Sequence, residues 1–340
     1  FILKSRSPSC AIRDAKIFPD ARAAHPLGKG PGLFARAVLD RFGSLAIEAL
    51  ARVPSGADIA SEFAERNAVV DLEALYLAIS QSGETYDTLG AVKEVQLRGG
   101  RIFGVVNVVG SSIARSCGAG VYVHSGPEIA VASTKAFTSQ VTALMVFALM
   151  LGRTRQLSGP QGREFGEGLL SVADKIRGYL DEPGPVHEAA SLLQDSTYAL
   201  FLGRGVSWPV AMEGALKLKE LAYIPCEAYP AGEMKHGPIA MLERGTPVLV
   251  VIPRDVHRQR TLSNVEEVRA RGARIIVVHT VGDLEAARLG DVSIAVPAVE
   301  PLLSPLVSVI PLQLIAYRTA LLMGRDIDRP RNLAKSVTVA

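Results

Sequence analysis

The stretch LYLAISQSGET, residues 75–85, joins an apolar run to a loop of small polar residues. The run 75–79 has the length and composition of a buried strand. The six residues after it carry three hydroxyl groups, one amide and one glycine, whereas an ordinary turn needs only one or two such residues. The stretch therefore predicts a strand that ends where many small donors are needed together.

Strands and helices alternate on both sides of this stretch. The expected strands are 75–80, 102–108, 120–124, 198–202, 247–252, 274–279 and 292–296. The expected helices lie near 87–98, 128–152, 208–222, 256–271 and 304–323. Such alternation is typical of parallel sheets with crossover helices. Because it occurs twice, the predicted fold class is α/β, with two doubly wound domains, each a mostly parallel sheet flanked by helices.

The predicted domain limits follow changes in composition and periodicity. Residues 1–32 contain four prolines and little periodicity, and a helical pattern starts near residue 33. The predicted divisions are an irregular or divergent segment at 1–44, a first domain at 45–160, a helical connector at 161–194, a second domain at 195–325 and a tail at 326–340.

Composition restricts the class of protein. The chain is 48% hydrophobic and 21% charged, as expected for a packed domain. Its net charge of +3 is too small to indicate binding to nucleic acid or to a membrane surface. Its longest apolar runs are shorter than the about 20 residues that a membrane span needs. Three scattered cysteines argue against a disulfide framework or a zinc site, and no secretory signal pattern opens the chain. We expect a cytoplasmic protein without metal, nucleic-acid or membrane partners.

The loop at 80–85 is a candidate anion site. In open α/β sheets, ligands bind beyond the carboxyl ends of strands, where the next helix presents unpaired N–H groups. The hydroxyls of Ser80, Ser82 and Thr85 and the amide of Gln81 would complete such a site, and Gly83 would permit close approach. A capped turn would use the same residue types, so the residues alone leave both interpretations open.

A charged helix and a nearby histidine form the second candidate. Glu213, Lys217 and Glu220 recur on one face of the expected helix 208–222. Such a face is usually a solvated, ion-paired surface, but this helix starts just beyond the end of a strand, where sites gather. His236 lies between glycine and proline in an expected loop, which suits proton transfer better than core packing.

Five motifs occur in order along the chain: SQSGET (80–85), VASTKAFT (131–138), EGALKLKE (213–220), AGEMKHGP (231–238) and PRNLAKSVTV (330–339). Together they resemble the isomerase part of the glutamine–fructose-6-phosphate aminotransferases, the glucosamine-6-phosphate synthases. That part consists of two sugar-isomerase (SIS) domains. The similarity runs from about residue 45 to residue 339.

The resemblance implies a set of substrate-binding residues. Those that would hold the sugar 6-phosphate are Ser80, Gln81, Ser82 and Thr85. Those that would contact the sugar are Val131, Ala132 and Ser133. The 326–340 segment would then be an active-site tail, and no cofactor is implied.

The resemblance also implies catalytic roles. Glu220 would move a proton between C1 and C2 of the sugar, and Lys217 would assist. His236 would help to open the sugar ring and would come from the neighbouring subunit of a homodimer with shared active sites. Lys335 would form a Schiff base with the keto sugar.

The chain departs from the family pattern at three places. Position 1 is Phe1, without the glutaminase domain and nucleophilic cysteine that precede the isomerase part in the family. Region 30–44 lacks the strand and Cys-Gly-Thr-Ser loop that also touch the phosphate, and the last residue is Ala340 where the family typically has glutamate.

The expected function is therefore aldose–ketose isomerisation of fructose 6-phosphate or glucosamine 6-phosphate without a glutaminase domain of its own. A stand-alone SIS-family glucosamine-6-phosphate deaminase or deglycase is the alternative. A non-catalytic sensor of sugar phosphates is disfavoured, because a sensor would need only the phosphate loop and not Glu220, His236 and Lys335 as well.

Overall fold

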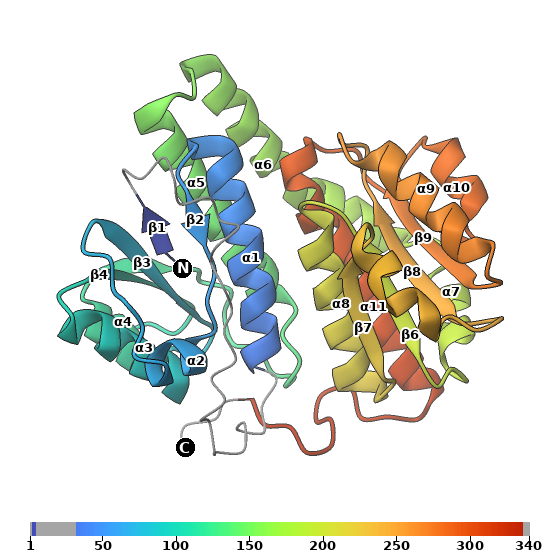
Figure 1. The fold of residues 1–340 in the computed structure, drawn as a ribbon, viewed down its shortest axis with the longest axis horizontal. Helices are drawn as coiled ribbons and strands as arrows, with labels where there is room; N and C mark the ends of the chain where they lie inside the picture. Colours follow the sequence, from blue (N-terminus) through green and yellow to red (C-terminus); the bar gives the residue numbers. More distant parts are fainter. Residues whose placement is uncertain (1, 5–31, 336–340) are drawn as a thin grey trace. The chain divides into compact units, whose positions relative to one another are not determined.

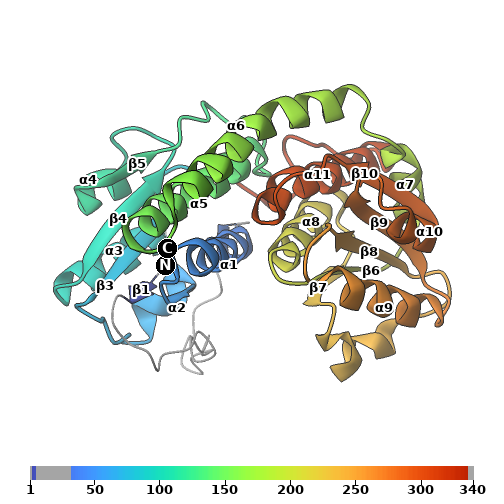
Figure 2. The same ribbon diagram turned by 90° about the horizontal axis from the view of Figure 1, so that it is seen from above.

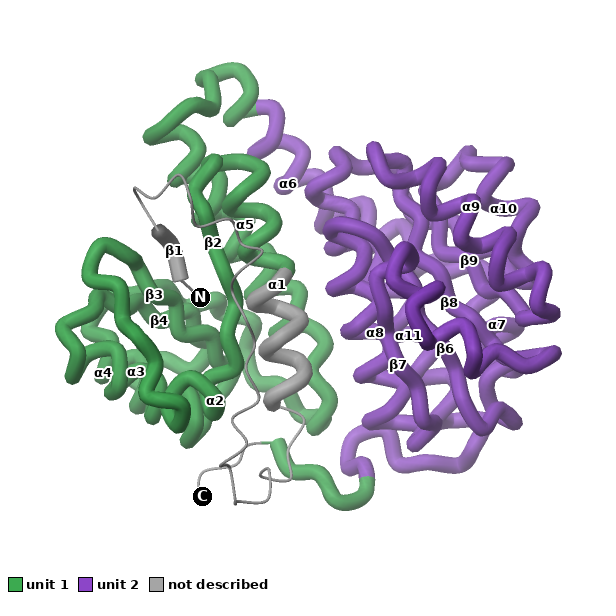
Figure 3. Tube along the Cα trace, in the orientation of Figure 1, with its two compact units in different colours: residues 1–163, 331–340 green, residues 164–330 purple. Residues whose placement is uncertain are grey.

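The computed structural model describes residues 2–4 and 32–335, with side chains from Phe42 onward, and it divides the chain into two compact units (Figure 3). Unit 1 comprises residues 1–163 and 331–340, and unit 2 comprises residues 164–330. Each unit contains one five-stranded sheet. The predicted α/β class with two sheets is confirmed.

The sheet of unit 1 is mixed. Its strands are β1 (Ile2–Lys4), β2 (Ser55–Gly56), β3 (Ala74–Ser80), β4 (Arg101–Val106) and β5 (Gly120–Tyr122). They lie in the order β2-β1-β3-β4-β5 (Figure 1). β3, β4 and β5 are parallel, whereas β1 is antiparallel to both of its neighbours. Because β3 is central and covered on both faces, it is a nearly continuous apolar run.

Helices cover both faces of this sheet (Figure 2). Its helices are α1 (Gly32–Ala51), α2 (Ala60–Glu65), α3 (Tyr86–Leu97), α4 (Ser112–Cys117) and α5 (Lys135–Arg155). Helices α2, α3 and α4 share one apolar core with the strands, and α1 packs with α5 on the other face. The backbones of α1 and α5 come close at Gly152, where a Cβ would lie 2.7 Å from the Leu50 carbonyl oxygen.

The sheet of unit 2 is entirely parallel. Its strands are β6 (Ala199–Gly203), β7 (Cys226–Pro230), β8 (Pro247–Ile252), β9 (Arg274–Thr280) and β10 (Val292–Val296). They lie in the order β10-β9-β8-β6-β7. Helices α9 (Arg258–Arg269) and α10 (Leu284–Leu289) cover one face through an apolar core. Helices α8 (Ser207–Ala222) and α11 (Ser304–Leu322) pack against each other on the other face, with α7 (Val186–Leu193) beside α11 (Figure 1).

The structure differs from the sequence prediction at the predicted limits of the first domain and the connector. The segment 1–44, expected to be irregular or divergent, contributes β1 to the sheet and contains the part of α1 up to residue 44, so the limit at residue 45 lies inside a helix. The expected connector at 161–194 is formed by α6 (Gly159–Asp181) and α7, and the division between the units lies within α6. β7 was not predicted, because its sequence CEAYP is only partly apolar.

Within the described residues, two stretches are long and apolar enough to span a membrane, namely α5 and Pro301–Leu322. Both belong to helices that carry much of the packing in their units, α5 against α1 and α11 against α8. Core helices have the same length and composition, so these stretches add no argument for a membrane partner.

Candidate active site

The loop at 80–85 is held in shape by its own small polar groups. Ser80 Oγ accepts a hydrogen bond from the Gly83 N–H at 3.0 Å and lies 3.0 Å from Thr85 Oγ1. Ser82 Oγ accepts from the Glu84 N–H at 3.2 Å. Because Thr85 turns toward Ser80 and does not cap α3, the first N–H groups of α3 remain available for an anion. The structure thus places the predicted phosphate residues in one loop at the start of a helix.

Residues beyond β4 brace this loop from the side. The Asn107 N–H donates to the Gln81 carbonyl oxygen at 3.3 Å, and the Ile113 N–H donates to the Gly83 carbonyl oxygen at 2.9 Å. The Glu84 carboxylate accepts from the Ser112 N–H at 2.8 Å, and hydrogen bonds from the side chain and backbone of Ser112 hold the pKa of Glu84 below its usual range. The one acidic group of the loop is therefore directed at α4.

Gly83 is the residue of the loop that tolerates least change. Its φ is +68°, and a Cβ would lie 1.9 Å from Ser111 Oγ. We expect Gly83→Ala to lower the free energy of unfolding of unit 1 by about 2 kcal/mol or more and to weaken binding of fructose 6-phosphate by about 10-fold or more. Denaturant titration and isothermal calorimetry measure the two effects.

Gly110→Ala is the matched control for this prediction. Gly110 has a φ of +69°, but a Cβ there would meet nothing within 4 Å. Gly110→Ala therefore introduces the same backbone strain as Gly83→Ala, but its Cβ does not clash with a neighbouring side chain. If Gly83→Ala unfolded and bound sugar phosphate like Gly110→Ala, the contact with Ser111 would not shape the loop.

The predicted sugar-contact residues Val131, Ala132 and Ser133 form the turn that leads into α5. Ala132 is buried, and its two neighbours are half-buried. Asn107, at the carboxyl end of β4, ties the preceding segment to the sheet: its Nδ2 donates to the Gly126 carbonyl oxygen at 2.9 Å, and its Oδ1 accepts from Ser125. Asn107 therefore contacts both the loop 80–85 and the segment that precedes this turn, at the same end of β4.

Lys335 lies against this turn, although it is far away in sequence. Its Nζ donates to Glu128 Oε2 at 2.9 Å and to the Ala130 carbonyl oxygen at 2.7 Å. The other carboxylate oxygen, Glu128 Oε1, accepts from the N–H groups of Thr134 and Ala136 at 2.7 and 3.3 Å. Burial raises the pKa of Glu128, but these hydrogen bonds and the Lys335 charge outweigh it, so the net pKa is lowered and the carboxylate stays ionised.

In unit 2, the charged face of α8 is buried. Lys217 Nζ lies 2.7 Å from Glu220 Oε2 and 3.4 Å from Glu213 Oε1, and none of the three side chains is more than 4% exposed. The alternative of a solvated, ion-paired face is therefore wrong. Burial lowers the pKa of Lys217, but the two carboxylates outweigh it and raise the pKa. The ammonium group stays charged.

Glu220 has one oxygen committed and one without a partner. Oε2 accepts the Lys217 hydrogen bond, while Oε1 is buried and has no hydrogen-bond partner in the described part of the chain. A buried polar atom without a partner is costly. It is also the acceptor that a general base needs.

His236 ends a short 3-10 turn, Glu233–His236, and is exposed. Met234 in the same turn is fully buried, and Lys235 forms an ion pair with Glu267 at 2.8 Å. These neighbours fix the turn on unit 2, so that the imidazole is presented at the surface.

The candidate residues thus fall into two groups, one in each unit. Unit 1 holds the phosphate loop, the sugar-contact turn and Lys335, which together offer anion binding and an amine. Unit 2 holds Lys217, Glu220 and His236, which offer proton transfer. Sequence reasoning missed Asn107 and Glu128, and only the position of Asn107 at the end of an expected strand pointed to it.

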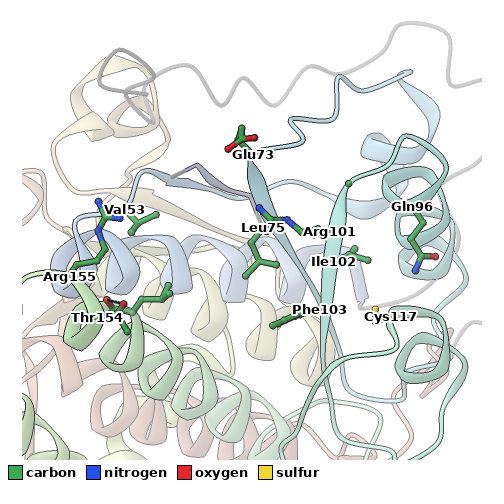
Figure 4. Close-up of a pocket in the computed structure, with 12 residues that line it drawn as sticks. Val53, Glu73, Leu75, Gln96, Arg101, Ile102, Phe103, Cys117, Thr154 and Arg155 are labelled. Carbon is green, nitrogen blue, oxygen red and sulfur yellow. Dashed lines mark hydrogen bonds between the residues drawn. The ribbon is translucent and has the colours of Figure 1, made fainter. Parts of the chain in front are cut away.

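A pocket of about 700 Å³ lies elsewhere in unit 1 (Figure 4). Leu75 and Arg101, at the amino ends of β3 and β4, line it together with Phe103 and Cys117. Burial raises the pKa of the Cys117 thiol to about 11, which leaves it unreactive at neutral pH. Since the phosphate loop follows the carboxyl end of β3, this pocket is not part of the candidate site.

Comparison with known proteins supports these assignments of fold. The family described as SIS domain matches residues 41–150 and 192–323. The glutamine–fructose-6-phosphate aminotransferase (isomerizing) of Thermus thermophilus is 49% identical over 303 residues, covering 88% of this chain and 50% of the relative. The enzyme of the same name from Chlorobaculum tepidum is 48% identical, covering 87% of this chain and 48% of the relative. The chain spans about half the length of these curated relatives.

Two solved structures have the same fold. The C-terminal domain of glucosamine-fructose-6-phosphate aminotransferase from Francisella tularensis matches with a TM-score of 0.84 and 36% identity, covering 87% of this chain and 84% of that one. Glucosamine-6-phosphate deaminase from Thermotoga maritima matches with a TM-score of 0.71 and 23% identity, covering 89% of this chain and 88% of that one. At this identity the match shows a shared fold and nothing more. The resemblance to the isomerase part of the aminotransferases is confirmed, and the chain belongs to the SIS domain family.

Proposed function

We propose that the chain is a sugar-phosphate aldose–ketose isomerase of the glucosamine-6-phosphate synthase type, acting on fructose 6-phosphate and glucosamine 6-phosphate in the cytoplasm. The observation that carries this proposal is the buried carboxylate of Glu220, with Lys217 on one oxygen and no partner on the other. The names of the relatives supply the substrate class.

Substrate binding falls to unit 1 in this proposal. The sugar 6-phosphate would be bound by Ser80, Gln81, Ser82 and Thr85 and by the N–H groups at the start of α3. The sugar carbons would lie along the turn at 131–133. Lys335, docked beside that turn, would then reach C2.

The chemistry needs one nucleophile and one base. The Lys335 nitrogen, as the neutral amine, attacks C2 of the open-chain keto sugar. One proton from solvent lets the C2 oxygen leave as water, and the resulting C=N nitrogen carries one positive charge. Ammonia then displaces the lysine from C2, which breaks the bond between C2 and the lysine nitrogen, and Glu220 removes the hydrogen on C1 and returns it at C2 to give glucosamine 6-phosphate. Without ammonia, water displaces the lysine, and Glu220 moves the same proton of the open-chain ketose through an enediol to give glucose 6-phosphate. Lys217 holds the Glu220 carboxylate by its other oxygen throughout.

A substrate series tests the proposal and separates it from a deaminase. The protein is incubated with fructose 6-phosphate alone, with fructose 6-phosphate and ammonium, and with glucosamine 6-phosphate. We expect isomerisation in the first incubation and ammonium-dependent glucosamine 6-phosphate in the second. Rapid ammonia release in the third with little isomerisation in the first would instead identify a deaminase.

His236 is proposed to open the ring of a substrate bound to the partner subunit of a homodimer. We expect His236→Ala to slow reaction of the cyclic substrate far more than of an open-chain analogue, because only the former needs ring opening. His187→Ala, which removes an exposed imidazole on α7, is the control. Equal losses with both substrates would contradict the role.

Subunit mixing tests the shared site. His236→Ala and Lys335→Ala are each expected to be inactive alone. In mixed dimers, one of the two sites combines an intact lysine with an intact histidine from the partner, so activity should recover to about a quarter of that of the unmodified protein. No recovery in dimers shown to exchange would place both residues in one subunit's own site.

A further inference from the structure

We propose that Glu128 is a positioning residue that holds the Lys335 amine at the sugar-contact turn and serves as its counter-ion. The inference rests on the proposed function for the role of Lys335. It is carried by one buried carboxylate that makes contacts to two distant parts of the chain.

Burial of the carboxylate fixes the geometry of its ion pair with Lys335. The Glu128 side chain is 4% exposed and that of Lys335 is 28% exposed. A solvent-exposed lysine keeps its rotamer freedom and gains little from an ion pair. A buried carboxylate, in contrast, cannot be compensated by water and binds its partner in a defined geometry. Lys335 is therefore fixed by Glu128 more firmly than a tail residue would be by surface contacts.

The two carboxylate oxygens of Glu128 bind groups on either side of the sugar-contact turn. Oε1 accepts from the Thr134 and Ala136 N–H groups at the start of α5, after the sugar-contact turn. Oε2 accepts from Lys335, which also donates to the Ala130 carbonyl oxygen before that turn. One carboxylate thus closes the turn at 131–133 and places the amine beside it, so the two cannot shift independently.

Glu128 also places a negative charge beside the reacting nitrogen. Lys335 gives one proton to solvent before it attacks C2, and one proton is taken up when water leaves. The resting ammonium and the Schiff-base nitrogen therefore each carry one positive charge, and the same carboxylate pairs with both without moving. Preorganised charges of this kind require no reorganisation during the reaction. A simple cap of α5 would need only the two backbone contacts and would not require a negative charge at Oε2.

Glu128→Gln separates the two roles. A glutamine carbonyl oxygen can still accept from Thr134 and Ala136, but the side chain no longer carries the charge that pairs with Lys335. Glu65→Gln makes the same change at an exposed position of α2 and is the matched control. Glu128→Ala removes both roles, and Lys335→Ala removes the amine.

The first readout needs no sugar. Trypsin cleaves after Lys335 only when that side chain is free to enter the protease, and release of the peptide 336–340 is followed by mass spectrometry. We expect release about 10-fold faster from Glu128→Gln than from the unmodified protein and Glu65→Gln. Equal rates would overturn the proposal.

The second readout uses fructose 6-phosphate and borohydride, which reduces a Schiff base to a stable adduct on Lys335. We expect the initial trapping rate to fall about 10-fold or more in Glu128→Gln, with calorimetric binding of the sugar phosphate unchanged. Trapping at the unmodified rate would overturn the proposal. If the unmodified protein formed no adduct while the trypsin difference persisted, the Schiff-base function would fail and Glu128 would stand as an anchor of the tail.

Discussion

Replacing Glu220 with glutamine is expected to lower kcat for fructose 6-phosphate isomerisation by about 1,000-fold, within the range that a general base contributes. Glutamine has nearly the same shape, but its amide cannot take the proton from C1. KM should change little, because the phosphate loop lies in unit 1. A coupled assay of glucose 6-phosphate formation measures the effect.

The fold should survive this substitution, since Lys217 retains Glu213 at 3.4 Å. Lys219→Gln is the control, because Lys219 lies on the same helix but is exposed. If Glu220→Gln kept activity within a few-fold of that control, another group would be the base. A large loss shared by both variants would indicate damage to α8 rather than lost chemistry.

Lys217→Met is expected to lower the free energy of unfolding of unit 2 by about 3–5 kcal/mol, because it removes the buried ammonium group that pairs with the Glu213 and Glu220 carboxylates. The pKa of Lys217 is raised, so its contribution is fully present below the ordinary lysine pKa and is lost only as pH rises through the raised value. The difference should therefore be constant between about pH 6 and pH 9. Urea unfolding across this range measures it.

Lys219→Met makes the same substitution at an exposed position of the same helix and is the matched surface control. It should change the urea midpoint little, because exposed charges contribute little to stability. Similar midpoints for the two variants would mean that Lys217 is not needed to neutralise the cluster, contrary to its complete burial.

β8 was predicted with its observed limits, because a continuous apolar run flanked by helices has few other interpretations. β10 was also predicted with its observed limits, although it is an edge strand with alternating burial; such alternation is itself typical of a strand. β7 was not predicted, because its sequence mixes polar and apolar residues. β1 was not predicted either, because a strand of three residues is too short to show a periodic pattern.

The position of the loop 80–85 between a strand and a helix was predicted correctly, because its structure is local: a strand end, a glycine and a helix start are adjacent in the chain. It could not decide whether the charged face of α8 was solvated or buried, because periodicity identifies a face but not what covers it. It missed Glu128 for a related reason. The contact with Lys335 joins positions 207 residues apart, and no local pattern reports such a pairing.

Unit 2 is an insertion within unit 1, since residues 331–335 return to the first unit after the whole of the second has been traversed. During synthesis, both sheets can form while Lys335, the proposed nucleophile, is still inside the ribosome, because chains fold from their amino end. Loop 80–85 and the Lys217–Glu220 pair would then exist before the amine arrives. A chain that stops before residue 335 should therefore form both sheets and still lack the amine that the proposed reaction requires.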